Sequence, residues 1–267
     1  MMRIALVIEY DGRGFCGFQS QPAACGVQDA LEAAVAAVAA EPARVVAAGR
    51  TDAGVHATAQ VVHFDSNATR PLAAWIRGVN ALLPPSAAVL SAREVEPAFH
   101  ARFSALARHY TYLLHNRGPR PALDAGRVGW YHRPLDADAM HEAAQVLLGE
   151  HDFSSFRAAE CQADSPVRTL ARAAVRRHGE LLRLEFTAPA FLHHMIRNLV
   201  GALVYVGTGK HDGPWLRALL EARDRKLAPP TFAPDGLYFT GVDYPSRFEL
   251  GPVRREPVLA VASGIAT

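Results

Sequence analysis

Apolar and polar residues repeat along this chain with the two periods of regular secondary structure. Apolar residues spaced three and four apart predict helices at residues 28–40, 71–83, 137–148, 192–206 and 214–225. Alternating or continuous short apolar runs predict strands at residues 3–10, 59–64, 89–95, 108–115, 169–177, 181–187 and 237–244. Asp136 is placed to cap its helix, because its side chain can accept hydrogen bonds from the first-turn N–H groups. In residues 181–187, Arg183 and Glu185 alternate with apolar side chains, which predicts one solvated face.

The order of these elements predicts an α+β fold. Each half of the chain reads strand, helix, strand, with further helices and strands after it. Adjacent hairpins and a mixed order favour α+β over a doubly wound parallel sheet. We therefore expect two similar halves with antiparallel or mixed sheets of the RRM or ferredoxin-like kind. The first half is residues 1–104 and the second is residues 105–267.

Composition narrows the cellular setting of this chain. The chain has 267 residues, of which 50% are apolar, so disorder over most of its length is not expected. The longest apolar run, residues 33–40, is too short to cross a bilayer, and the N-terminus lacks a secretory signal pattern. The cysteines Cys16, Cys25 and Cys161 form no C-x-x-C pair, which argues against a disulfide scaffold and favours the cytoplasm.

Charge is concentrated in the middle of the chain. The net charge is only +2, but residues 93–133 carry seven arginines against three acidic residues. Aromatic residues are interleaved with these arginines. Clustered positive charge with aromatic side chains is typical of nucleic-acid binding.

Several common kinds of chemistry lack support in the sequence. Gly12, Gly14 and Gly17 match the dinucleotide pattern G-x-G-x-x-G, but residues 18–22 are poor helix starters, so we expect a glycine-rich loop beside a site. The 12 histidines include no H-E-x-x-H pattern, and no metal site is expected. His193 and His194 are predicted to lie on different faces of a helix. A serine hydrolase elbow is absent.

One polar segment, residues 48–56, points to a reactive site. Two glycines flank Arg50 and Asp52, so the backbone can approach a ligand closely while presenting a guanidinium and a carboxylate. Taken alone, Asp52 fits a turn or capping role. However, Arg197 lies in an almost wholly apolar helix, and a buried arginine needs a partner. Arg197 could pair with Asp52 and keep it ionised and nucleophilic, or its head could reach water along its apolar stem.

Ordered motifs along nearly the whole chain resemble the tRNA pseudouridine synthase A family. The matching segments are residues 10–12, 17–21, 48–56, 99–105, 108–112, 191–198, 236–239 and 242–245. The resemblance implies an isomerase that converts uridine to pseudouridine at positions 38, 39 and 40 of the tRNA anticodon stem-loop. It implies a homodimer without metal, nucleotide cofactor or membrane, and two halves joined around a central catalytic cleft. The alternative is a non-catalytic RNA-binding protein with two RRM-like halves, although the RRM aromatic signature is absent.

The resemblance also assigns roles to individual residues. It makes Asp52 the nucleophile, and leaves open attack on the sugar C1′, attack on the base, or a glycal route. It makes Arg50 the residue that occupies the space of the flipped base, and Tyr110 the residue that stacks on the uracil. Arg197 matches the position expected to pair with Asp52.

The tRNA contacts that the resemblance implies fall in three places. Beside Tyr110, they are Phe99, His100, Ala101, Arg102, Phe103, Arg70, Gln162, Ala163, Asp164, Ser165 and Pro166. Two departures from the family pattern stand out. Asp164 replaces a basic residue, and Phe18 stands where tryptophan is usual.

Overall fold

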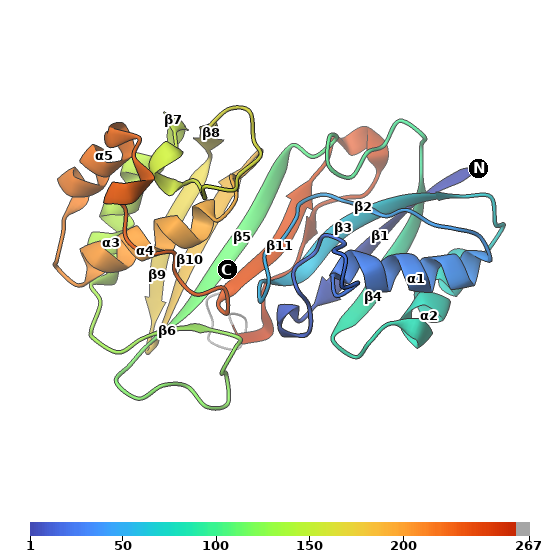
Figure 1. The fold of residues 1–267 in the computed structure, drawn as a ribbon, viewed down its shortest axis with the longest axis horizontal. Helices are drawn as coiled ribbons and strands as arrows, with labels where there is room; N and C mark the ends of the chain where they lie inside the picture. The colour runs from blue at the N-terminus through green and yellow to red at the C-terminus, as the bar shows by residue number, and fades with distance from the viewer. Residues whose placement is uncertain (260–267) are drawn as a thin grey trace. The chain divides into compact units, whose positions relative to one another are not determined.

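The computed structural model describes residues 1–259, which form two compact units (Figure 1). The N-terminal unit comprises Met1–Arg108 and Tyr238–Arg255, and the C-terminal unit comprises His109–Leu237 and the described residues from Glu256. The division predicted from the sequence has one boundary, after residue 104, and assigns the predicted strand 237–244 to the second half. The units differ from that division because the last strand pairs with the N-terminal unit, and local patterning carries no information about such pairing.

The N-terminal unit contains one mixed sheet with strand order β4-β1-β3-β11. Its strands are β1 (Met2–Tyr10), β3 (His56–Ser66), β4 (Ala87–Val95) and β11 (Leu237–Asp243), with the short β2 (Val46–Ala47) and β12 (Val253–Arg254). β1 is antiparallel to both neighbours, whereas β11 runs parallel to β3 and pairs Tyr238 with His56. The parallel pairing brings a strand from the end of the chain beside the strand that follows residues 48–55.

Two helices pack together in the N-terminal unit (Figure 1). They are α1 (Val27–Ala39) and α2 (Leu72–Leu82). Leu31 and Val35 of α1 and Trp75 of α2 are fully buried. The Trp75 ring meets Phe64 of β3 edge-on, with ring centroids 5.1 Å apart. These side chains form part of the core that supports β3, although Leu72, which the helical spacing places on the apolar face of α2, is 41% exposed.

The C-terminal unit has the same classes of element in a different order. Its strands β5 (Ala107–Asn116), β10 (Leu181–Ala188) and β9 (Arg172–His178) are adjacent, β6 (Gly129–Tyr131) pairs with β5, and β7 (Gly149–Asp152) pairs with β8 (Val167–Leu170). Its helices are α3 (Ala137–Ala144), α4 (Met195–Gly207) and α5 (Gly213–Ala222). The α+β prediction is confirmed. Within residues 1–259, every helix is too short or too polar to span a membrane.

The predicted solvated face of β10 is wrong. Arg183 is 4% exposed and Glu185 is 5% exposed. Arg183 forms ion pairs with Glu185 at 2.8 Å and with Glu256 at 2.9 Å, and Arg172 also pairs with Glu185. Alternation distinguishes the polar face of a strand from its apolar face, but it does not reveal whether the polar face is covered.

The helix α3 supplies a direct test of the predicted cap. The Asp136 carboxylate accepts hydrogen bonds from the N–H groups of Asp138 (3.0 Å) and Ala139 (2.9 Å). We expect Asp136→Ala to lower the free energy of unfolding by about 1 kcal/mol, because two helix N–H groups lose their acceptor. Urea denaturation measures this change. Glu160→Ala, at an exposed position outside any helix, is the control, and an equal loss in both variants would contradict the capping role.

The cysteines depart from the prediction. Cys16 and Cys25 form a disulfide, with Cα atoms 5.4 Å apart, while Cys161 is a free thiol. The N–H of Cys16 also donates to the carbonyl of Cys25 at 2.9 Å. The two cysteines are nine residues apart, so they give no C-x-x-C signal in the sequence. They meet because the connection between β1 and α1 folds back on itself.

Candidate active site

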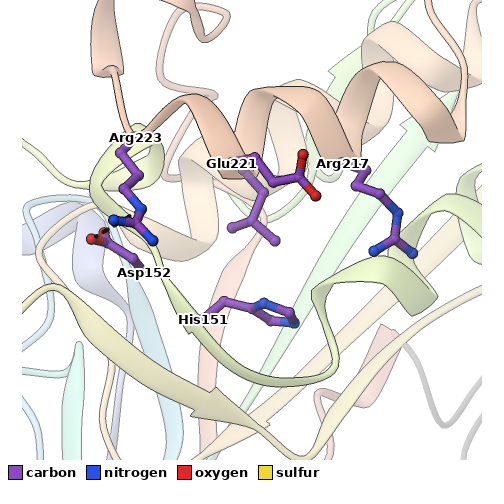
Figure 2. Close-up of a pocket in the computed structure, with 6 residues that line it drawn as sticks. His151, Asp152, Arg217, Glu221 and Arg223 are labelled. Carbon is purple, nitrogen blue, oxygen red and sulfur yellow. Dashed lines mark ion pairs between the residues drawn. The ribbon is translucent and has the colours of Figure 1, made fainter.

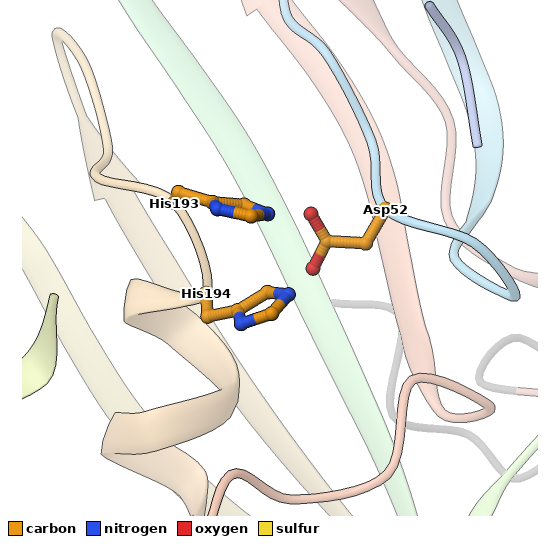
Figure 3. A group of neighbouring side chains, drawn as sticks. All are labelled: Asp52, His193 and His194. Atoms are coloured by element: carbon orange, nitrogen blue, oxygen red, sulfur yellow. The ribbon is translucent and has the colours of Figure 1, made fainter. Parts of the chain in front are cut away.

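Asp52 lies in a tight turn between β2 and β3. The carbonyl of Asp52 accepts a hydrogen bond from the N–H of Val55 at 3.1 Å. Gly54 has a φ of 79°, a left-handed conformation that favours glycine at this turn position. Arg50 is exposed and Asp52 is partly exposed. Figure 3 shows the Asp52 carboxylate projecting from this loop.

Buried polar side chains hold the backbone of this loop. The fully buried Gln60 side chain donates to the carbonyl of Gly49 at 2.7 Å and accepts from its N–H at 3.4 Å. The Tyr10 hydroxyl is hydrogen-bonded to Thr51 Oγ1 at 2.8 Å. Burial raises the pKa of Tyr10 to about 12, so its hydroxyl stays neutral at physiological pH. The loop is therefore fixed at residues on either side of Arg50, which preorganises its side chains.

The glycine-rich segment after β1 packs against the same loop. The N–H of Gly12 donates to His56 Nδ1 at 3.1 Å, and the N–H of Phe18 donates to the carbonyl of Thr51 at 2.9 Å. A Cβ atom on Gly12 would lie 2.1 Å from the carbonyl oxygen of Val55. A single 3₁₀ turn covers Gly12–Gly14, and the first α-helix begins only at Val27. The glycine-rich segment therefore packs against the polar loop, and the expectation that it lies beside a functional site stays a prediction.

Residues 99–103 form a second functional candidate in the N-terminal unit. Phe99 and Ala101 are fully buried, so they anchor the segment. Phe103 is 75% exposed and stacks on His100 with ring centroids 4.3 Å apart. The Arg102 guanidinium lies 5.5 Å from the centroid of the Phe103 ring. The outward-facing members present aromatic surface and positive charge, which suit bases and phosphates.

His63 of β3 supports this segment through a bond that depends on pH. Its Nδ1 accepts a hydrogen bond from the N–H of Ala101 at 3.2 Å. Burial, together with the positive charge of Arg3 and the neighbouring His100, lowers the pKa of His63 to about 4. The unfolded chain, with its ordinary histidine pKa near 6.5, binds a proton that the folded chain rejects. The stability that neutral His63 contributes is complete above pH 6.5 and is lost as the pH falls toward 4.

We therefore expect His63→Gln to flatten the fall in unfolding free energy between pH 6.5 and pH 4. Urea denaturation at pH 7.5, 6.0 and 4.5 measures this dependence. His178→Gln, at an exposed position, is the matched control and should keep the wild-type pH dependence. A His63→Gln profile parallel to that of the wild type would show that another group carries the acid sensitivity.

The C-terminal unit carries the other predicted catalytic residues. Tyr110 on β5 is 8% exposed, and its ring meets Phe191 edge-on with centroids 5.1 Å apart. Arg197 lies in the first turn of α4, and its Nε donates to the carbonyl of Phe232 at 2.9 Å. Asp52 belongs to the other unit, so its pairing with Arg197 stays a prediction.

The paired histidines before α4 differ from their predicted placement. α4 begins at Met195, so His193 and His194 precede it (Figure 3). Their rings lie against each other, with centroids 4.0 Å apart. The prediction that they occupy different faces of a helix is wrong, because they lie in the turn before α4, where His194 has a φ of 60°.

The remaining predicted tRNA contacts lie on loops. Two guanidinium groups tie down residues 162–166: Arg157 donates to the carbonyl of Ala163 at 2.7 Å, and Arg168 donates to that of Ser165 at 2.9 Å. Asp164 in this loop is exposed. Arg70 is exposed, and its Nε donates to the carbonyl of Val38 near the end of α1 at 3.3 Å. Arg70 thus also stabilises a helix C-terminus.

A small pocket lies between α5 and the end of β7 in the C-terminal unit (Figure 2). It is lined by His151, Asp152, Arg217, Leu220, Glu221 and Arg223. Arg223 and Asp152 form an ion pair of 3.6 Å beside it. None of these residues belongs to the predicted site. Their opposite charges leave the lining without a strong preference for one sign of ligand.

The sequence did not reveal the residues that hold the loop around Asp52. Tyr10, Gln60 and Arg108 act on backbone or side chains of residues 48–51 from β1, β3 and β5. Gln60 had a visible signal, because it is a polar residue in the mainly apolar predicted strand 59–64. The other two had none, since their partners are backbone or hydroxyl groups far away in the chain.

Comparison with known proteins identifies the family. A sequence model described as tRNA pseudouridine synthase matches residues 6–104 and 143–245. The tRNA pseudouridine synthase A of Thiobacillus denitrificans is 59% identical over 250 residues, covering 94% of this chain and 96% of the relative. Those of Chromobacterium violaceum (61% identical; 93% and 95% covered) and Methylobacillus flagellatus (56% identical; 98% and 100% covered) are similarly close. The chain therefore belongs to the tRNA pseudouridine synthase family.

Proposed function

We propose that this protein isomerises uridine to pseudouridine at positions 38, 39 and 40 of the tRNA anticodon stem-loop. The reaction breaks the bond between C1′ and N1, rotates the uracil, and joins C1′ to C5. The C5 proton leaves and N1 gains a proton, so the product has the composition of the substrate. This balance requires no external oxidant, reductant or nucleotide.

Asp52 is the proposed nucleophile. Its carboxylate is partly exposed, and the residues just before it are held by Gln60, which bonds the backbone of Gly49, and by Tyr10, which bonds the Thr51 hydroxyl. A fixed, accessible carboxylate is what covalent catalysis requires. This geometry, within a chain of the pseudouridine synthase family, is the observation that carries the proposal. Arg197 is proposed to pair with Asp52 and favour its ionised form.

Arg50 and Tyr110 are proposed to manage the flipped nucleotide. A base stacked in a helix must leave the stack before C1′ becomes accessible, which costs a few kcal/mol. The exposed Arg50 guanidinium can occupy the vacated space, because it is planar and can stack while contacting phosphate. The largely buried Tyr110 ring is proposed to stack on the extruded uracil.

The tRNA is proposed to lie along exposed basic and aromatic side chains. Arg102 and Phe103 offer a guanidinium and an exposed ring from one segment, while Arg70 and residues 162–166 add further contacts. The proposed enzyme works in the cytoplasm as a homodimer, with each tRNA contacting both subunits. Sedimentation equilibrium tests the dimer directly.

A tritium-release assay tests the proposed reaction. A tRNA transcript labelled with tritium at uridine C5 is incubated with the protein in EDTA without nucleotide. We expect release that stops when each target uridine has lost one tritium. The control transcript has cytidine at positions 38, 39 and 40 and should release none. Tight, salt-dependent binding without release would instead support a non-catalytic RNA-binding protein.

The acidic residue in the loop 162–166 yields a separate prediction. Asp164→Arg should strengthen tRNA binding by about threefold to tenfold near physiological salt, because it replaces repulsion with a phosphate contact. The slope of log affinity against log salt should also steepen by about 0.7–0.9. Filter binding at several salt concentrations measures both quantities. Asp138→Arg, on the exposed surface of α3, is the control. Equal effects of Asp164→Arg and Asp138→Arg on tRNA affinity would show that the loop 162–166 does not contact the tRNA.

A further inference from the structure

One buried guanidinium contacts both functional segments of the N-terminal unit. Arg108 is the second residue of β5, belongs to the N-terminal unit and is 8% exposed. Its Nε donates to the carbonyl of Ala48 at 2.8 Å, and its Nη2 donates to the carbonyl of Arg102 at 2.6 Å. Ala48 opens the loop that carries Arg50 and Asp52. Arg102 belongs to the segment 99–103.

The guanidinium is well suited to hold these two carbonyls in a constant relation. Its donors lie in one plane at fixed angles, whereas a lysine ammonium is a single point of positive charge on a flexible stem. Ala48 is 1% exposed, so its bond to Arg108 is shielded from water and is stronger than an exposed bond of the same length. Because Arg108 uses the backbone oxygen of Arg102, the Arg102 guanidinium is left to face outward.

Neighbouring bonds act on one segment at a time. Gln60 holds Gly49 in the loop 48–56, and the Tyr10 hydroxyl holds Thr51. The Tyr244 hydroxyl donates to the carbonyl of Ala101 at 2.7 Å and so holds the segment 99–103. Arg108 differs from these residues because its contacts join the two segments to each other.

We propose that Arg108 is a positioning residue that fixes the loop 48–56 relative to the segment 99–103. On the proposed function, on which this inference rests, one segment carries the nucleophile and the other contacts the tRNA. A fixed relation between them places the target nucleoside at the nucleophile when the tRNA binds. A displacement of about 1 Å at such a point can cost on the order of 100-fold in rate.

The main test is Arg108→Lys, which keeps the positive charge but not the planar pair of donors. We expect the single-turnover rate constant at saturating tRNA to fall by about tenfold or more, and the Kd for tRNA to rise. We also expect backbone hydrogen exchange to become faster in both segments. Only variants with a native near-ultraviolet circular dichroism spectrum are compared, and Arg108→Gln is the second variant.

Matched controls separate a link between segments from simple loosening. Tyr244→Phe removes a bond to the segment 99–103 and should accelerate hydrogen exchange there but not in the loop 48–56. Tyr10→Phe removes a bond to the loop and should do the reverse. Arg108→Lys with wild-type exchange and rate, or with faster exchange in one segment alone, would overturn the proposal.

The unmodified chain supplies a measurement that needs no variant. If Arg108 joins the segments, their amides should open together, with the same dependence on low concentrations of urea. Independent opening of the two segments would refute the link. Hydrogen exchange does not depend on catalysis. A protein that released no tritium would therefore refute the proposed function, but its exchange data would still test whether the two segments open together.

Discussion

Asp52→Asn is expected to abolish pseudouridine formation, with a loss of about 10³-fold or more in single-turnover rate. The amide has nearly the shape of the carboxylate but neither its charge nor its nucleophilicity. Gln60 holds the backbone of Gly49, and the Val55 N–H holds the carbonyl of Asp52, and neither contact involves the replaced group. The loss should therefore be chemical. Tritium release from uridine C5 measures it.

The same variant should keep its fold and much of its affinity for tRNA. We expect its urea midpoint and its Kd to stay close to those of the wild type. Asp138→Asn, an isosteric change at an exposed position on α3, controls for nonspecific effects of removing one negative charge. If Asp52→Asn formed pseudouridine at the wild-type rate, the nucleophile would have to be another group.

The second large effect is expected at Gly12. An added Cβ would lie 2.1 Å from the carbonyl oxygen of Val55, far inside van der Waals contact, and this oxygen belongs to the backbone of the loop 48–56. Gly12→Ala must therefore displace either the glycine-rich segment or the loop that carries Asp52. We expect it to lower the unfolding free energy by about 1–3 kcal/mol and the rate by about tenfold or more.

Gly14→Ala is the matched control within the same glycine motif. Its added Cβ would come no closer than 3.1 Å to any neighbour, and that neighbour is the mobile side-chain oxygen of Ser86. Its stability should change by less than about 0.5 kcal/mol. Urea denaturation and single-turnover rates are measured for both variants. Similar losses of stability and rate in the two variants would contradict a specific role for the contact between Gly12 and Val55.

Regular elements were predictable where local pattern and burial agree. α1 and β5 match their predicted ranges closely, because their apolar spacing is the pattern that their packing buries. The predicted start of α4 at residue 192 is wrong, because His194 takes a left-handed conformation and the helix begins at Met195. The residue types at 192–194 do not reveal this conformation. The covered polar face of β10 was misjudged because alternation is a property of one strand, whereas coverage depends on other segments.

The candidate site was predictable to the extent that it is contiguous in the chain. Residues 48–56 contain the charged pair, the turn glycine and the small neighbours in one short segment, so their character is visible without a structure. The disulfide between Cys16 and Cys25 and the bonds from Gln60 and Arg108 were not predictable in this way. Each of these contacts forms only because the fold brings the two residues close together in space.

The sequence by itself determined the α+β class, the polar loop with Arg50 and Asp52, and the resemblance that led to the family. These properties reside in spacing and residue type, which act locally through hydrogen-bonding preference and burial. Only the tertiary structure decided that β11 pairs with β3, that Gly12 lies against Val55, and that one guanidinium joins Ala48 to Arg102. Such contacts join residues that are distant along the chain, so their geometry is set only when the sheet has formed and brought those residues together.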